Sequence, residues 1–367
     1  MGFIEIFVKK AHHRFWQRLN DDHVVNGSPG KLIENDGAYF VIRMKEMYLK
    51  NTRTLWRKFY PLLHAFIEYQ KGEEHAIAGP GQLRDLGEAN LERVVNLNFR
   101  LSGPTPYKGG DVSLLAGLYA VPGQDAAKAL IGTLSTIAGL GGIALGQIPA
   151  VANAVKTGVE SVIGLNESTL QLGIRDTFYK ENPLRSGYHV AIDSDAEKVK
   201  MSKLWLSKGR LVQGNDPVAA VPYEDSDYMV LEVERRDSRD DWPALPDIAA
   251  HQAAFAAIMG DSGLTVDQKR EKIRDAWGAF QNTLSISAYL VKPDAQRIAL
   301  SVAEDLNARL TALKSGNPFE TRSWYSSKPE SRKPAVFDFV DVPDYLDLTD
   351  PESIKRAARA LAANPFA

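Results

Sequence analysis

The sequence predicts an α+β protein: a β-rich sandwich or barrel-like domain with a helical hairpin insertion, followed by a helical region. Three observations lead to this prediction. Short apolar segments separated by glycine-rich turns run from about residue 38 to 235, which favours antiparallel strands. The segment 129–155 interrupts them with 27 consecutive uncharged residues. After Trp242-Pro243, apolar residues recur at helical spacing.

The N-terminal segment 4–19 is predicted to be a basic amphipathic helix. Its apolar residues recur at helical spacing, with lysines and arginines mostly on the other faces. Such a helix can lie on an anionic membrane or pack on the body of the protein. The residues of its apolar face are Ile4, Phe7, Val8, Ala11, Phe15 and Leu19.

The β-rich region is predicted from segments in which apolar and polar residues alternate or β-branched residues gather. Lys208-Gly209 separates two such segments and predicts a tight hairpin. The predicted strands cover Leu63 to Tyr69, Val95 to Leu101, Leu170 to Ile174, Tyr188 to Ile192, Leu204 to Leu206, Arg210 to Val212 and Met229 to Val233.

The uncharged run is predicted to form a helical hairpin lined by small residues, with Gly139, Gly142, Gly146 and Ala150 as its contact residues. A stripe of small residues lets two backbones approach closely. Three interpretations remain open: a hairpin buried in the protein's own core, a segment that enters a membrane or docks on a partner after a trigger, and a constitutive transmembrane span. The last would place two halves of one domain on opposite sides of a bilayer. A loose match to the dinucleotide-binding pattern at 139–144 lacks the surrounding βαβ alternation that the pattern requires.

Helices are predicted for residues 246–259, for a segment capped by Thr265, for a segment beginning near Pro293 and for one after Asp350-Pro351. The mixed charges of residues 234–241 predict ion pairs at a domain junction. The predicted organisation is an N-terminal helix and linker (1–36), a β-rich domain (37–240) with its insertion (124–165), a helical region (241–316), and a linker with a C-terminal tail (317–367).

Composition excludes several classes of site. The chain has no cysteine and a net charge of −2, so it has neither thiolate chemistry nor the basic excess of a nucleic-acid-binding protein. No P-loop or zinc-protease motif occurs. Two acidic clusters, 193–195 and 224–227, are interpreted as solvated turns, with Ca²⁺ or Mg²⁺ ligation as the alternative. We therefore predict no metal and no cofactor.

The loop 103–111 is the most distinctive one in the sequence, with Tyr107 and Lys108 at its tip. Rigid prolines and permissive glycines around an aromatic and a basic residue suit partner recognition, and also suit a long hairpin turn. Both interpretations remain open.

The leading functional hypothesis is a non-enzymatic interaction or effector protein, cytoplasmic and conditionally membrane-associated. Its insertion, residues 126–165, would engage another protein, a second copy of the chain or an anionic membrane, but no nucleic acid. One alternative is a structural subunit of a multi-protein assembly. Another is an enzyme of unfamiliar type that uses the acidic clusters and His189.

Overall fold

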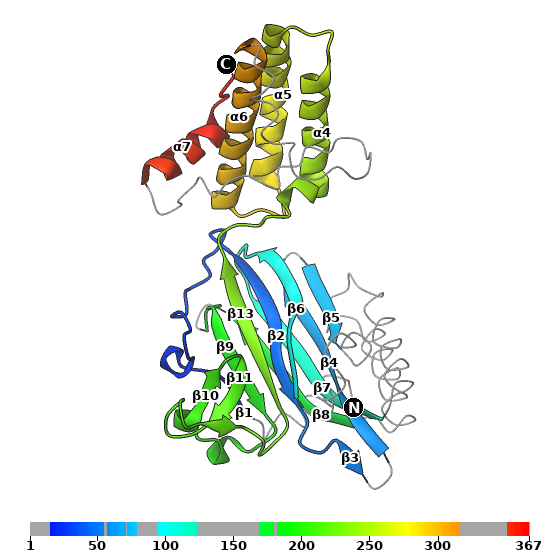
Figure 1. The fold of residues 1–367 in the computed structure, drawn as a ribbon, viewed down its shortest axis with the longest axis vertical. Helices are drawn as coiled ribbons and strands as arrows, with labels where there is room; N and C mark the ends of the chain where they lie inside the picture. Colours follow the sequence, from blue (N-terminus) through cyan, green and yellow to red (C-terminus); the bar gives the residue numbers. More distant parts are fainter. Residues whose placement is uncertain are drawn as a thin grey trace. The chain divides into compact units, whose positions relative to one another are not determined.

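The structure, a computed structural model, describes residues 15–54, 57–70, 72–78, 94–122, 169–179, 182–315 and 351–366. It divides the chain into two compact units, which Figure 1 shows. The first unit comprises Met1–Asn35 and Tyr39–Arg236, and the second comprises Asp36–Ala38 and Asp237–Ala367. The described strands belong to the first unit and the described α-helices to the second. The α+β class is thereby confirmed.

The first sheet has the strand order β1-β9-β13-β2-β6, and all its neighbouring strands are antiparallel. Its strands are β1 (Phe15–Arg18), β2 (Tyr39–Tyr48), β6 (Val94–Pro106), β9 (Gly187–Ile192) and β13 (Tyr228–Arg236).

The second sheet has the order β3-β4-β7-β8, with β5 also paired to β4. These strands are β3 (Arg53–Thr54), β4 (Arg57–Tyr69), β5 (Gly72–Ala78), β7 (Val112–Pro122) and β8 (Thr169–Phe178). A small third sheet contains β10 (Leu204–Ser207), β11 (Arg210–Gln213) and β12 (Val221–Pro222).

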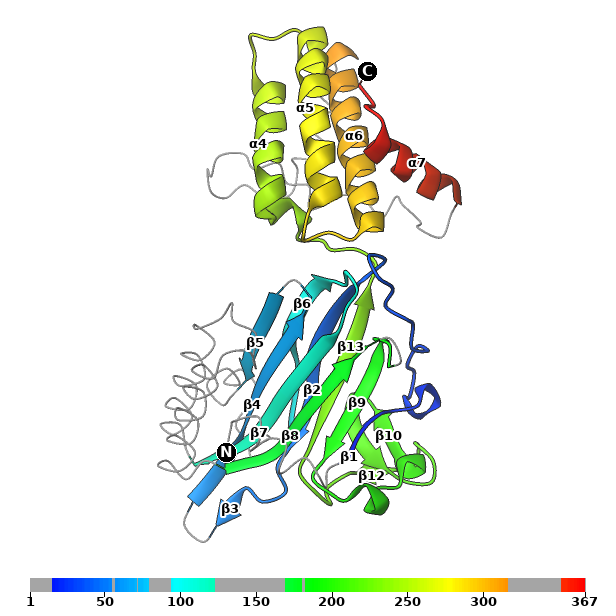
Figure 2. The ribbon, with the colours of Figure 1, turned by 180° about the vertical axis from the view of Figure 1, so that it is seen from behind.

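The first and second sheets face each other as in a β-sandwich (Figures 1 and 2). Trp16 of β1 donates a hydrogen bond to Asp176 of β8, with 2.7 Å between nitrogen and oxygen. Phe40 of β2 contacts Tyr69 of β4 edge to face, with ring centroids 6.0 Å apart. Leu63, Ala65 and Ile67 share the face of Tyr69 along β4, because residues two apart lie on one face of a strand, and all three are fully buried.

The third sheet covers the opposite face of the first sheet. Its leucines share one apolar cluster with strands β1, β2, β9 and β13. The cluster consists of Phe15, Leu19, Tyr48, Val190, Ile192, Leu204, Leu206, Leu211, Tyr223, Tyr228 and Val230. The first sheet is consequently buried on both faces at its centre.

Several predicted strands are confirmed in position. Ser207 pairs with Arg210, and Lys208 and Gly209 have φ angles of 51° and 76°. Two consecutive positive φ values are those of a type I′ turn, the turn that matches the twist of a two-residue hairpin. Strand β2 was not among the strands predicted individually, although it lies between β13 and β6 in the first sheet.

The prediction of one helix over residues 4–19 is wrong for its last turn. Phe15–Arg18 is strand β1, antiparallel to β9. The four residues Phe-Trp-Gln-Arg show no alternation of apolar and polar residues, so their own pattern does not predict a strand. All four pair with β9, and this ladder supplies their backbone hydrogen bonds in place of a helical turn. Residues 4–14 lie outside the described part.

The second unit contains α4 (Pro246–Gly260), α5 (Val266–Ile286), α6 (Lys292–Ser315) and α7 (Pro351–Ala362). These agree with the predicted helices. The Thr265 hydroxyl accepts a hydrogen bond from the Gln268 amide, and the Gln268 side chain bonds back to the Thr265 amide. This reciprocal capping box satisfies two of the amides that a helix start leaves without partners.

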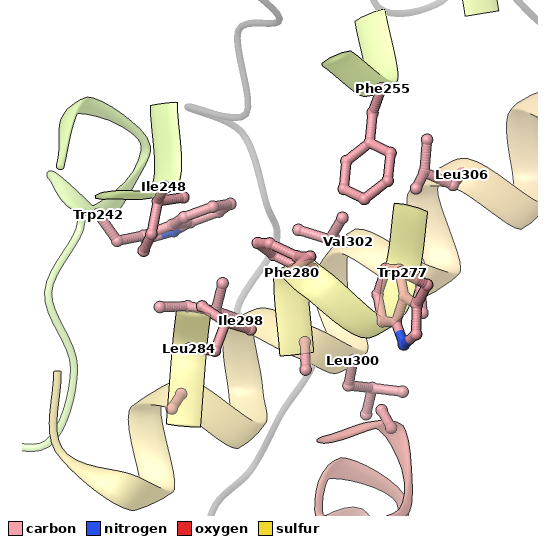
Figure 3. Packing of buried hydrophobic residues seen from close by; sticks show 14 of the residues in the cluster. Trp242, Ile248, Phe255, Trp277, Phe280, Leu284, Ile298, Leu300, Val302 and Leu306 are labelled. Atoms are coloured by element: carbon pink, nitrogen blue, oxygen red, sulfur yellow. The ribbon is translucent and has the colours of Figure 1, made fainter. Parts of the chain in front are cut away.

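An apolar core holds these helices together, and Figure 3 shows part of it. Phe280 of α5 contacts both Phe255 of α4 and Trp277 edge to face, with centroids 5.5 and 5.2 Å apart. Ile298 and Val302 of α6 are fully buried in the same cluster. Helix α5 therefore contributes apolar residues toward both neighbouring helices.

The predicted ion pairs of the mixed-charge run are present. Arg239 makes two hydrogen bonds to the Asp241 carboxylate, at 2.7 and 2.8 Å. The Arg239 amide also donates to the fully buried Asp294, which pairs with Arg297 at 2.6 Å. The predicted helical insertion 124–165 and linker 317–335 lie outside the described residues.

Candidate functional site

Four of the predicted contact residues, Gly139, Gly142, Gly146 and Ala150, lie outside the described residues. The strands on either side of them are described. Strand β7 ends at Pro122 and strand β8 begins at Thr169, and the two are antiparallel neighbours with Ala120 opposite Thr169. The chain therefore leaves the second sheet and returns to it at the same end of one strand pair.

Residues 123–168 thus connect two strands that a loop of two to five residues would join. Loops longer than about 12–15 residues are uncommon in compact domains and are usually functional or linkers. The pairing of β7 with β8 explains neither the length nor the uncharged composition of this connection.

Tyr107 and Lys108 lie in the loop between β6 and β7, at the other end of β7. Strand β7 has 11 residues, which at about 3.3 Å per residue separates its ends by roughly 35 Å. Tyr107 and Lys108 therefore lie at the opposite end of β7 from the point where the connection 123–168 leaves the sheet.

The first four residues of the predicted loop, 103–106, belong to strand β6, which pairs with β2 as far as its last residue, and the loop itself covers 107–111. Side chains from the neighbouring hairpin hold this segment in place. The carboxylate of Glu74 in β5 accepts hydrogen bonds from the Gly103 amide at 2.9 Å and from the Thr105 hydroxyl at 2.6 Å. With the Gln70 amide turned so that its nitrogen faces the loop, it donates to the carbonyl oxygens of Lys108 and Gly109, at 3.0 and 3.3 Å. These anchors were not predicted, because they come from a different segment of the chain.

The tip of the loop is also ordered by its own contacts. The Tyr107 hydroxyl donates to the Gly110 carbonyl oxygen at 3.0 Å. Partial burial raises the pKa of that hydroxyl, and the nearby negative charge of Asp111 raises it further. The loop thus carries a neutral phenol and a lysine on a backbone held by these hydrogen bonds.

The two acidic clusters meet at one end of the first sheet, where β9 ends and β13 begins. The Asp193 amide donates to the Asp227 carbonyl oxygen at 2.9 Å. The Asp227 carboxylate accepts from the Lys50 amide at 2.6 Å, and Asp195 pairs with Lys198. In the part of the chain that the structure describes, no three His, Cys, Asp or Glu side chains are placed to hold a metal ion. The contacts that these clusters make, with backbone amides and with Lys198, are those of hydrogen-bonded turns.

His189 lies between the first and second sheets. Its ring stacks on Trp16 at a centroid distance of 5.2 Å and meets Phe178 edge to face at 5.5 Å. Burial, together with the smaller effect of the Arg18 positive charge, lowers the pKa of the imidazole to about 4. Among the described residues, the His189 Nδ1 atom has no hydrogen-bond partner. These surroundings are those of a neutral core histidine, not of a general base oriented by an acid.

The absence of a side chain at Gly187 leaves the space that the Arg18 side chain occupies. It donates to the Ser186 carbonyl oxygen at 3.0 Å. Gly187 has a φ of +142°, and a Cβ atom there would lie 2.6 Å from the Arg18 Nε atom. A larger residue at position 187 would therefore displace the arginine beside His189.

Glu46 is a buried carboxylate that sequence reasoning missed. It is fully buried between the first and third sheets and accepts from the Leu211 amide at 2.7 Å and from Arg210 at 3.3 Å. The Tyr228 hydroxyl also hydrogen-bonds to it. Burial raises the pKa of Glu46, while these donors oppose the rise. Each carboxylate oxygen has a protein donor, so the group joins two sheets.

Within the described residues, none of the helices has the length and apolar character needed to cross a bilayer.

Comparison with known proteins does not assign a family. The chain matches no protein-family model, and it matches no curated protein.

Proposed function

We propose that this protein is a non-enzymatic interaction or effector protein whose apolar segment, residues 126–165, engages another protein or, conditionally, a membrane. The observation that carries the proposal is the pairing of β7 with β8. Two adjacent antiparallel strands need only a short turn, and here residues 123–168 join them, including 27 consecutive uncharged residues. The sheet does not require these residues, so their function lies elsewhere.

The strand pairing also limits how the segment can enter a membrane. Both ends of the segment start from the same end of β7 and β8, so a single crossing would leave one strand on the wrong side. Two crossings need about 40 apolar residues, at roughly 20 for each span. The uncharged run has 27. The geometry thus favours docking on a protein or shallow insertion as a hairpin over a complete span.

Small residues supply the contact in this proposal. Gly142 and Gly146 are four positions apart, with Ala150 four further on. A helix with this spacing presents one face with almost no side-chain bulk, which favours close contact with another helix. A Gly in a water-exposed helix costs about 1 kcal/mol relative to Ala, so a helical segment with this composition needs packing to offset that cost. Tyr107 and Lys108 would form a second, separate contact surface.

The experiment replaces residues 123–168 with a four-residue Gly-Ser-Asn-Gly turn. The shortened protein should still unfold cooperatively, because β7 and β8 stay paired. It should lose self-association and vesicle binding. Mass photometry measures the first property. Flotation with phosphatidylcholine–phosphatidylglycerol vesicles, before and after limited proteolysis, measures the second.

Matched substitutions test whether the small-residue face itself is needed, without deleting the segment. Gly142→Leu with Gly146→Leu should abolish the same binding, whereas Gly142→Ala with Gly146→Ala keeps the face small and should retain it. A wild-type chain that stays monomeric and never floats would contradict the proposal. Equal binding by the Leu and Ala pairs would remove the small-residue face as its basis.

A further inference from the structure

The C-terminal helix α7 packs on α5 and α6 through a small set of contacts. Ala357 and Ala360, one turn apart, are 1% and 6% exposed. Phe366, just beyond the helix, packs its ring against Trp277 of α5 with centroids 5.3 Å apart. Leu300 of α6 belongs to the same cluster, and Figure 3 shows it beside α7. The apolar contact of this segment thus comes from the Phe366 ring, two alanines and the partly buried Leu361.

Polar groups of α5 hold the end of α7. The Gln281 side chain donates to the carbonyl oxygens of Ala360 and Ala363, at 3.0 and 2.7 Å. The last carbonyls of a helix have no partner within the helix, so one glutamine here satisfies two of them. The Asn364 side chain donates in return to the Arg274 carbonyl oxygen at 2.8 Å. The surface of α5 and α6 therefore recognises a helix terminus as well as an apolar face.

We call this surface the docking face and define it by Arg274, Trp277 and Gln281 of α5 with Leu300 and Glu304 of α6. Glu304 pairs with Arg356 of α7 at the exposed edge. An apolar centre, a cap for helix carbonyls and a charged rim are the elements by which proteins bind amphipathic helices.

The fit of α7 on the docking face is incomplete. The Trp277 indole Nε1 atom is fully buried yet has no acceptor among the described residues, even with α7 in place. A buried donor without an acceptor weakens the association that buries it. Helix α7 has 12 residues, a length that is marginal for an isolated helix in water. Both facts favour a helix that docks reversibly.

The connection to α6 makes weak docking sufficient within one chain. Residues 316–350 separate Ser315 from Pro351. Because the two helices belong to one chain, the effective concentration of α7 at the docking face is on the order of 1 mM, the scale of intramolecular association. With an intrinsic dissociation constant in the micromolar range, α7 would then be docked in most molecules.

We propose that the docking face is a binding site for an amphipathic helix, which α7 occupies as an exchangeable ligand, and that α7 of a second copy binds in the same place. The recognised pattern is a pair of small residues three positions apart, followed by an aromatic residue beyond the helix end. This inference does not depend on the function proposed for residues 126–165.

The first test uses the full-length chain and a labelled peptide of residues 350–367. Ala360→Arg places a charged side chain at a buried contact and should release α7 in its own chain. The peptide should then bind this variant at least about tenfold more tightly than it binds wild type, where α7 competes at its effective concentration. Ala362→Arg, at an exposed position of the same helix, is the matched control and should behave like wild type.

The second test measures exchange between two copies. Gln281→Glu keeps the size of the side chain but turns a carboxylate toward the α7 carbonyls, so that chain has a free α7 and a blocked docking face. Mixed with the Ala360→Arg chain, it should form a heterodimer in sedimentation, whereas each variant alone stays monomeric. No dimer in the mixture, or no peptide binding below about 1 mM, overturns the proposal.

Amide hydrogen exchange of the wild-type chain distinguishes an α7 that is released locally from one that unfolds only with the whole helical unit. The amides of α7 should exchange at least about tenfold faster than those of α5 and α6, since local release precedes global unfolding. Exchange of all three helices in one step would show that α7 is an integral part of the core. Unfolding of the helical unit by Ala360→Arg would show the same, and either result overturns the proposal.

Discussion

Replacing His189 with phenylalanine should remove most of a pH-dependent loss of stability from the first unit. The folded protein holds the pKa of His189 at about 4, against 6.5 for an unperturbed histidine. Between these pH values the unfolded chain binds a proton that the folded chain does not, so the free energy of unfolding falls as the pH falls. The stabilisation is fully present above about pH 6.5 and is lost toward pH 4.

The two pKa values give the size of the effect. A difference of about 2.5 units corresponds to about 3 kcal/mol over the whole range. Roughly 2 kcal/mol of it is lost between pH 7.0 and 4.5. Phenylalanine keeps an aromatic ring beside Trp16 and Phe178, and it removes an Nδ1 atom that has no partner among the described residues. His189→Phe should therefore cost little at pH 7.0.

The assay compares the two proteins at pH 7.0 and 4.5 in a urea series, with pulsed amide exchange in β9 and β13 as the probe. Carboxylates that titrate in the same range cancel in the comparison. His251→Phe, in the helical unit, is the control and should leave the pH dependence of β9 and β13 unchanged. In addition, the His189 imidazole resonances should titrate near pH 4 in the folded protein. Titration near 6.5, or an equal pH dependence in His189→Phe and wild type, would refute the reasoning.

Three further substitutions test other contacts. Glu46→Leu leaves the buried Leu211 amide without its acceptor and should lower the free energy of unfolding of the first unit by about 1–3 kcal/mol; an unchanged urea midpoint for β2 and β11 would contradict this. Thr265→Ala removes the α5 cap, which bonds to Gln268, and should cost about 1 kcal/mol, with Thr265→Ser largely neutral by calorimetry. Phe280→Ala should cost about 3–5 kcal/mol in the helical unit because it opens a cavity in the core, and a loss of less than about 1 kcal/mol would argue against that packing.

Local features of the fold could be read from the sequence because nearby residues make them. The Thr265 cap joins residues three positions apart, and the Lys208-Gly209 turn joins two adjacent strands. Interactions over so few residues leave a recognisable pattern. The helix ends and the hairpin were therefore predicted close to where they occur.

Strand β2 was harder to recognise because it is buried on both faces. Eight of its ten residues are buried, with only Arg43 and Lys45 partly exposed. A strand between two other strands, covered by a sheet on each face, shows no alternation of apolar and polar residues. Its place in the first sheet depends on β13 and β6, which are distant in the sequence.

At the candidate site, too, some features are visible in the sequence and others depend on the fold. Tyr107 and Lys108 were predicted from their loop, but the contacts of Glu74 and Gln70 that hold this loop come from the preceding hairpin. The uncharged composition of residues 129–155 is visible in the sequence. That both ends of this connection meet at one strand pair follows only from the pairing of β7 with β8.

The sequence by itself determined the class of each segment, because hydrophobic period, caps and turn residues act over a few positions. Tertiary structure alone decided which segments became neighbours, and with them the strand at Phe15–Arg18, the neutral state of His189 and the burial of Glu46. Strand pairing and desolvation depend on groups brought together from distant parts of the chain, and no local pattern records those groups.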